Sequence, residues 1–199
     1  MCPKKRLLLV YPNQRWQKDD INTVWDLNPA TLCLLGAMVK DLVDVKIVDA
    51  QFHNMTRETF AKEIENFNPD FVGISVMSSE YRDTLDVSAE IVKNVKRNII
   101  VIAGGIHVTT NYDYAVKNKN IDYCVRGEGE YVLRQLISYL IGQGDLPSEG
   151  LQSQAFVKDL SQLPWPNYQL VDFRAYVKRP PRPHAGGPPL LPYVRMTTT

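Results

Sequence analysis

The chain has 199 residues, of which 44% are hydrophobic and 23% are charged, and its formal net charge is +1. This length suits one domain with an appendage, or two small domains at most. Because the charges nearly balance, no general electrostatic field attracts nucleic acid or an anionic membrane. No apolar run is long enough to cross a bilayer, so we expect neither a nucleic-acid partner nor a membrane partner.

The cysteines of the chain are Cys2, Cys33 and Cys124, and they are far apart in the sequence. None has the close pairing that zinc or iron–sulfur sites need, so we expect no metal ligand in this chain. A sparse, odd number of cysteines favours the reducing cytoplasm. Cys33 and Cys124 have apolar neighbours in the sequence, which predicts that both side chains are buried in the core.

In the first part of the chain, apolar runs alternate with segments of helical periodicity. Residues 6–11 form a continuous apolar run, which is typical of a strand covered on both faces. Residues 29–42 carry apolar side chains at helical spacing, and residues 45–48 form a second predicted strand. Residues 56–67 are predicted to form a helix with Thr56 as its N-cap.

The same alternation continues through residue 141. Residues 71–77 form a third predicted strand, and an amphipathic helix follows at residues 81–95. The remaining predicted elements are strands at 99–103 and 121–125 and helices at 111–117 and 130–141. Each predicted strand is thus followed by a helix, which is the pattern of repeated β–α units.

This pattern predicts an α/β fold with a five-stranded parallel sheet and helices on both faces. Right-handed crossovers leave few topologies, and we expect the doubly wound, flavodoxin-like (Rossmann-like) order. Ligands of such sheets bind outside the carboxyl ends of the strands, at the topological switch point. The composition changes after Gln143, so we predict a domain at residues 1–143 and a linker at 144–199, with a Pro- and Gly-rich stretch at 180–192.

The loops after the predicted strands limit the class of ligand. Residues 12–15 lack the Gly-x-Gly-x-x-Gly pattern of a dinucleotide fold. They also lack the phosphate loop of a flavodoxin and the acidic cluster of a response-regulator receiver. The paired Gly104 and Gly105 let a bulky ligand lie close to the backbone. Residues 127–130 open a helix whose first amides are available to polar groups of a ligand.

Several short motifs at these positions occur together in one known family. Ser75-Val-Met77 fits the Ser-x-Leu motif of cobalamin domains, with Met in place of Leu. Residues 104–109 match Gly-Gly-x-His-x-Thr, and residues 127–130 match Gly-Glu-Gly-Glu. Residues 163–166 match Leu-Pro-x-Pro, and the tail at 195–199 is similar to the stretch that precedes the cysteine trio of that family. The chain therefore resembles the cobalamin-binding N-terminal domain of class B radical S-adenosylmethionine (SAM) enzymes, which include methyltransferases and anaerobic magnesium-protoporphyrin monomethyl ester cyclases.

The resemblance implies that the chain binds cobalamin and contains no catalytic residue of its own. The implied cofactor-binding residues all follow predicted strands, and they are Asn13, Gln14, Ser75, Met77, Ser78, Ser79, Gly104, Gly105, His107, Val108, Thr109, Gly127, Glu128 and Gly129. The first loop lacks the Asp-x-His-x-x-Gly motif of methionine-synthase-like modules, in which the histidine binds cobalt. The resemblance therefore implies base-off cobalamin with no histidine ligand from the protein.

Some side chains near the predicted strand ends have more than one interpretation. His53 is expected to have a surface or structural role, whereas His107 either lines the cofactor cleft or stabilises its loop. For Glu128 and Glu130, capping of the following helix or bonds to the amides of the cofactor are preferred to a role as general base. The linker aromatics Trp165, Tyr168 and Phe173 are expected to pack the linker onto the sheet.

Two functions from different classes remain open at this point. The resemblance implies a module that supplies methylcobalamin for methyl transfer to a substrate carbon. Its partner would be a downstream radical SAM domain, in which SAM and a [4Fe–4S] cluster are bound. The alternative is a stand-alone module that binds or senses a nucleotide or another small molecule on the same fold. Colour separates the two, because bound cobalamin makes a protein pink to red.

Overall fold

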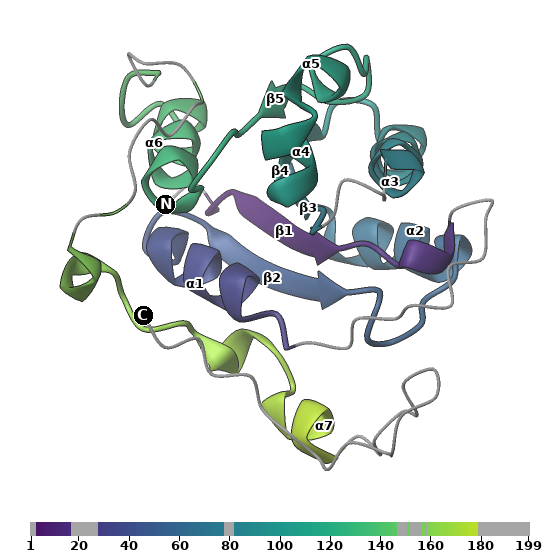
Figure 1. Cartoon of the computed structure of the whole chain (residues 1–199), viewed down its shortest axis with the longest axis horizontal. Coiled ribbons are helices and arrows are strands. Elements are labelled where there is room, and N and C mark those ends of the chain that lie inside the picture. The colour runs from purple at the N-terminus through teal and green to yellow at the C-terminus, as the bar shows by residue number, and fades with distance from the viewer. Residues whose placement is uncertain are drawn as a thin grey trace.

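The structure is a computed structural model, and it describes residues 3–16, 28–77, 82–146, 151, 157 and 159–178. Its centre is a parallel sheet with the strand order β2–β1–β3–β4–β5 (Figure 1). The strands are β1 (Arg6–Tyr11), β2 (Asp44–Asp49), β3 (Phe71–Ser75), β4 (Ile100–Gly104) and β5 (Tyr123–Cys124). The predicted doubly wound α/β fold is confirmed, and the switch point lies between β1 and β3.

Helices cover both faces of this sheet. The α-helices are α1 (Ala30–Val39), α2 (Arg57–Phe67), α3 (Arg82–Val95), α4 (Ile106–Thr110), α5 (Tyr112–Ala115), α6 (Glu130–Leu140) and α7 (Phe173–Lys178). Short 3₁₀ turns are η1 (Gln14–Trp16), η2 (Leu160–Gln162) and η3 (Tyr168–Leu170). Helices α1 and α6 pack together on one face, and α2 and α3 pack together on the other.

The central strand β1 shows why these layers form. Side chains of a strand point alternately to its two faces. Leu8 and Val10 belong to the apolar core on the α2/α3 face, whereas Leu7 and Leu9 belong to the core on the α1/α6 face. All of them are at most 2% exposed, so a continuous apolar run was the correct signal for a strand buried on both sides.

Helix α2 begins at the N-cap that the sequence predicts. The Thr56 hydroxyl oxygen accepts a hydrogen bond from the Thr59 amide at 3.2 Å, as predicted for an N-cap. At the other end, Asn68 has a positive φ of 47° and its amide donates to the Ile64 carbonyl oxygen. A left-handed residue that closes the last turn is a common helix stop.

The observed elements differ from the predicted ones mainly after β4. Residues 104–109 were expected to be a loop, but Ile106–Thr110 forms helix α4 directly after Gly105. Strand β3 ends at Ser75 rather than at residue 77, and β5 contains only Tyr123 and Cys124. The predicted site residues Ser78 and Ser79, and the predicted stretches at 180–192 and 195–199, lie outside the described residues.

The C-terminal segment, residues 159–178, lies along the outer side of α1 and reaches the end of β2 (Figure 1). The Asn167 amide donates to the Cys33 carbonyl oxygen of α1 at 3.0 Å. Leu170 packs closely against Gly36, where a Cβ atom would be only 2.5 Å from the Leu170 side chain. The segment therefore completes the apolar core on the α1/α6 face.

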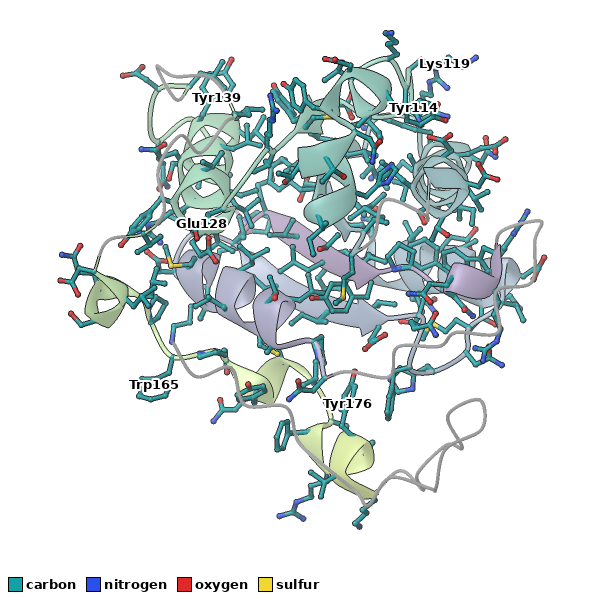
Figure 2. The ribbon with its side chains drawn as sticks, viewed as in Figure 1. Tyr114, Lys119, Glu128, Tyr139, Trp165 and Tyr176 are labelled. Carbon is teal, nitrogen blue, oxygen red and sulfur yellow. The ribbon has the colours of Figure 1, made fainter. Side chains whose placement is uncertain are left out.

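A buried polar contact fixes the end of this segment. The Tyr176 hydroxyl donates to Oδ2 of Asp49, the last residue of β2, at 3.0 Å. The Tyr176 ring also stacks on Phe52, with the ring centroids 3.8 Å apart. Both Tyr176 and Asp49 are buried, at 9% and 4% exposure, and Figure 2 shows Tyr176 pointing from α7 toward the sheet.

The linker aromatics behave differently from one another. Packing is confirmed for Tyr168, which lies against the α1/α6-face core, and the Phe173 ring lies 4.8 Å from the Tyr168 ring. The prediction was wrong for Trp165, which is 92% exposed and points away from the molecule (Figure 2). Pro164 and Pro166 flank Trp165, and each fixes its own φ angle and lacks a backbone N–H donor.

Candidate functional site

A cavity of about 160 Å³ lies where the carboxyl ends of β1, β3 and β4 meet α1 and α6. It is therefore located at the switch point, where α/β sheets bind their ligands. Its lining is mostly apolar, and the residues are Leu9, Thr31, Leu32, Leu35, Gly73, Ile74, Ser75, Ile102, Ala103, Gly104, Gly105, Val125, Gly127, Glu128, Gly129, Glu130 and Leu133. Of the predicted site residues, the structure brings together Ser75, Gly104, Gly105, Gly127, Glu128 and Gly129.

Strand register explains the apolar floor of the cavity. Leu9, Gly73 and Ile102 are paired across three adjacent strands. Ser75 and Gly104 form the next pair on the same face, two residues further along. Gly73 makes room for the Leu9 side chain, which would be only 2.8 Å from an added Cβ, whereas a Cβ at Gly104 would have its nearest neighbours at 3.9 Å.

The adjacent glycines after β4 have different roles. Gly104 has open space beside it, because an added Cβ would have its nearest neighbours at 3.9 Å, in Val125. Gly105 has a φ of 92° and a ψ of −176°, a conformation that is essentially limited to glycine. An added Cβ there would lie 2.6 Å from the Val76 carbonyl oxygen. Gly105 is thus required by the backbone itself, whereas Gly104 keeps the cavity open.

Thr109 connects the loops after β4 and β5. Its hydroxyl donates to the Gly105 carbonyl oxygen at 3.0 Å and accepts a hydrogen bond from the Gly127 amide at 3.0 Å. This arrangement holds the two glycine-containing loops beside each other. Thr109 was predicted to bind cofactor, but it does not line the cavity and has a positioning role in this structure.

His107 and Val108 also lie away from the cavity lining. Both are on α4 and are buried, at 1% and 0% exposure. Val108 belongs to the core on the α2/α3 face, and the His107 ring lies 6.5 Å from that of Tyr114. The interpretation of His107 as a cleft-lining residue is therefore not supported. The reason is that α4 turns these side chains into the core immediately after Gly105.

The first-loop candidates connect β1 to the turn after β2. The Asn13 amide group donates to the Met55 carbonyl oxygen at 3.0 Å, and Asn13 is 2% exposed. The Gln14 backbone amide donates to Oε1 of Gln51 at 2.8 Å. Neither Asn13 nor Gln14 lines the cavity, and neither does Met77, which packs against the core on the α1/α6 face.

Glu128 and Glu130 are the acidic side chains among the described residues of the cavity lining. Glu128, labelled near the start of α6 in Figure 2, accepts a hydrogen bond from the Val157 amide at 2.7 Å through its Oε2. Burial raises the pKa of Glu130, and the negative charge of Glu128 raises it further. Glu130 was not among the predicted cofactor-binding residues, although a bond to the amides of the cofactor was one of the two roles preferred for it from the sequence.

Other kinds of site are not found in the described part of the chain. Within those residues, no three His, Cys, Asp or Glu side chains are grouped closely enough to hold a metal ion. His53, the other described histidine, is exposed after β2 and contacts Phe52 edge-on. None of the described helices combines the length and the apolar character that a membrane crossing requires.

A parallel, doubly wound sheet with an apolar, glycine-lined cavity at its switch point defines a class of small-molecule-binding α/β domains that lack a phosphate loop. Residues 21–137 match the model of the B12-binding domain family. That match covers more than half of the chain, so the protein belongs to the B12-binding domain family.

Comparison with curated proteins gives relatives that are much longer than this chain. It is 30% identical over 187 residues to an uncharacterized methyltransferase of Pyrococcus horikoshii, a match that covers 86% of this chain and 40% of the relative. It is also 30% identical over 136 residues to the anaerobic magnesium-protoporphyrin IX monomethyl ester cyclase of Rubrivivax gelatinosus. This match covers 67% of this chain and 24% of the cyclase. The chain thus spans less than half the length of these relatives.

Solved structures show the same fold. The cobalamin-dependent SAM radical enzyme OxsB with aqua-cobalamin bound superposes with a TM-score of 0.64 at 18% identity, covering 82% of this chain and 24% of OxsB. A cobalamin-binding protein from Desulfitobacterium hafniense gives a TM-score of 0.50 at 13% identity. The match covers 70% of this chain and 60% of that protein. At these identities the likeness shows the fold alone.

Proposed function

We propose that this chain is the cobalamin-carrying module of a radical SAM enzyme. The observation that carries the proposal is the apolar cavity at the switch point of a sheet that belongs to the B12-binding domain family. The proteins similar to this chain support the enzyme class, since they include a methyltransferase, a cyclase and a cobalamin-dependent SAM radical enzyme.

The described residues fit the lower part of a base-off cobalamin. The aliphatic floor around Leu9 and Ile102 suits a flat, apolar heterocycle, and the missing side chain of Gly104 provides part of its space. Ser75 supplies a hydroxyl group at the lining of the same cavity, where it can bond polar atoms of the nucleotide tail. The cavity is therefore the proposed site of the lower base.

The proposed state of cobalt is one without a histidine from the protein. His107 is a buried residue of α4, and His53 is exposed after β2, a strand to one side of the switch point. With no imidazole ligand, the lower face of cobalt would carry a weak oxygen or amide ligand, water or none. When bound, the cofactor would supply a cobalt centre that accepts a methyl group and passes it on.

The downstream reaction belongs to the same proposal. Methyl transfer from SAM to a substrate carbon would need a radical SAM domain with its iron–sulfur cluster as the partner of this module. The part of the chain after the strand–helix repeats, which begins near Gln143, would lead to that partner. The substrate would be selected outside the residues described here.

Titration of the chain with methylcobalamin in the dark, followed by visible absorbance, tests the binding proposal. We expect a one-to-one complex and a shift of the visible absorbance from the red base-on form toward the yellow base-off form. A folded protein that causes no spectral change and no calorimetric heat at high micromolar cofactor would contradict cobalamin binding. Nucleotide binding without colour would instead support the stand-alone sensing module.

Paramagnetic resonance of the cob(II)alamin complex tests the state of the lower ligand. We expect cobalt lines without nitrogen superhyperfine splitting, because neither imidazole nor the base of the cofactor would be bound. A nitrogen triplet would contradict the proposed ligation. His53→Ala and His107→Ala variants would then show whether the nitrogen comes from the protein.

A further inference from the structure

The Glu130 carboxyl group is unusual among the groups that line the cavity. Its Oε2 atom is shielded from solvent and has no hydrogen-bond partner among the described residues. A buried polar atom without a partner carries a large free-energy cost, and natural structures rarely leave one in place without a reason. Because Glu130 lines the cavity, a ligand in that cavity can supply the missing partner.

The surroundings of Glu130 favour its protonated form more than solvent does. Burial raises its pKa, and the neighbouring carboxylate of Glu128 raises it further. Glu128 itself is engaged by the Val157 amide at 2.7 Å, so it is less available to a ligand. A protonated carboxyl group has one O–H donor in addition to its acceptor oxygen. Glu130 is therefore suited to a ligand atom that accepts a hydrogen bond.

The rest of the cavity limits what that ligand can be. The lining near Glu130 includes Leu9, Ile102 and Leu133, which present apolar surface. The occupant must therefore be mostly apolar, with a polar atom near the start of α6. An aromatic nitrogen heterocycle has this character, since its faces are apolar and a ring nitrogen in its edge accepts a hydrogen bond.

We propose that Glu130 is a specificity-determining residue that recognises the free ring nitrogen of the lower base of base-off cobalamin. This inference rests on the proposed function, because it requires the lower base to leave cobalt and enter the cavity. The carboxyl O–H donates to the ring nitrogen that cobalt has released. The contact selects cobamides that have a benzimidazole-type base over those whose lower group has no nitrogen in its ring.

The test compares cofactors that differ only below the corrin ring. Methylcobalamin contains the complete nucleotide tail, methylcobinamide lacks it, and the cresolyl cobamide has a phenolic lower group without a ring nitrogen. Dissociation constants are measured by absorbance for the unmodified chain, Glu130→Gln and Glu130→Leu. Glu65→Leu, at an exposed position on α2, is the matched control for the change of charge and size.

We expect Glu130→Leu to weaken methylcobalamin binding about tenfold, the effect of losing one buried hydrogen bond. Its affinity for methylcobinamide and for the cresolyl cobamide should change less than threefold, which is within the usual scatter of such contributions. Glu130→Gln retains an N–H donor, so it should stay within about threefold of the unmodified chain for all three cofactors. The Glu65→Leu control should match the unmodified chain.

The possible failures are distinguishable. If the unmodified chain binds neither methylcobalamin nor methylcobinamide, the proposed function is wrong and the inference is wrong with it. If the chain binds both cofactors and Glu130→Leu weakens them equally, or weakens neither, Glu130 does not recognise the base and only the inference is overturned. Urea unfolding of each variant without cofactor shows whether a change of fold contributes.

Discussion

At the scale of single residues, adjacent glycines carry different physical constraints. Gly104 ends β4 with its missing side chain toward the cavity, whereas Gly105 has a backbone conformation that side chains rarely allow. From the sequence, both residues were predicted to allow the close approach of a ligand. That role stays a prediction for Gly104, whereas the backbone conformation of Gly105 gives it a role in folding.

Substitution of each glycine by alanine separates these roles. Gly104→Ala should change the free energy of unfolding by less than about 1 kcal/mol, but it should weaken cobalamin binding about tenfold because the new methyl group fills the cavity. Gly105→Ala should lower the free energy of unfolding by about 1–3 kcal/mol through backbone strain. Urea unfolding and absorbance titration measure the two effects. Equal loss of stability in both variants would contradict the distinction.

The cysteines of the core provide a second prediction for single residues. Burial raises the pKa of Cys33 and of Cys124 from 9.0 to about 11. At pH 8 this leaves about 100-fold less thiolate than an exposed thiol has, and the thiolate is the reactive form. We therefore expect iodoacetamide to label both residues at least about 100-fold more slowly in the folded protein than in urea. Peptide mass spectrometry reports each site, and rapid labelling of either residue in the folded protein would show that it is accessible.

At the scale of elements, the C-terminal segment depends on a contact that joins residues far apart in the chain. Tyr176 in α7 donates to Asp49 at the end of β2, and both groups are buried. Burial and the negative charge of Asp49 raise the pKa of Tyr176, so the hydroxyl group stays protonated and remains a donor. This contact, with the stacking on Phe52, holds α7 against the domain.

Removal of the hydroxyl group tests that contact. Tyr176→Phe retains the ring but deprives the buried Asp49 carboxylate of one donor, so the free energy of unfolding should fall by about 1–3 kcal/mol. The control is Tyr139→Phe, because Tyr139 lies on α6 and is 40% exposed. This substitution should change the free energy of unfolding by less than about 0.5 kcal/mol. Urea unfolding measures both, and equal stabilities would mean that the Tyr176 hydrogen bond contributes nothing.

At the scale of the whole molecule, the question is where the folded unit ends. The predicted domain ends at residue 143, but Leu163, Tyr168 and Leu170 pack against the core on the α1/α6 face. Helix α1 is buried on its outer side by this segment as well as on the side that faces the sheet. The packing favours an end beyond the C-terminal segment, which includes Tyr176.

Truncation distinguishes the two boundaries. A chain that ends at Lys178 keeps all the contacts of the C-terminal segment named above and serves as the reference. A chain that ends at Gln143 exposes the apolar side of α1 and should lose at least about 2 kcal/mol, since burial of one large apolar side chain contributes about 1.5–3 kcal/mol. Urea unfolding followed by circular dichroism measures the difference. Equal stabilities would place the boundary at residue 143, as the sequence alone predicted.

The sequence by itself determined the order and type of the main elements. Strands such as Arg6–Tyr11 have continuous apolar runs. In α2, the helical spacing of apolar residues and the Thr56 N-cap both lie within one short stretch of sequence. These signals are local, so they do not require knowledge of the rest of the fold. The repeated β–α alternation then limited the topology, and the order of the glycine motifs indicated the family.

The tertiary structure decided which candidates meet at the cavity. His107, Val108 and Thr109 belong to the same motif as Gly104, yet only the glycines line the cavity, because α4 turns the following side chains into the core or toward the β5 loop. The partners of Glu130 and Tyr176 likewise depend on elements that are distant in the sequence. Periodicity specifies the face of an element, but the atoms opposite that face are determined only when the whole chain has packed.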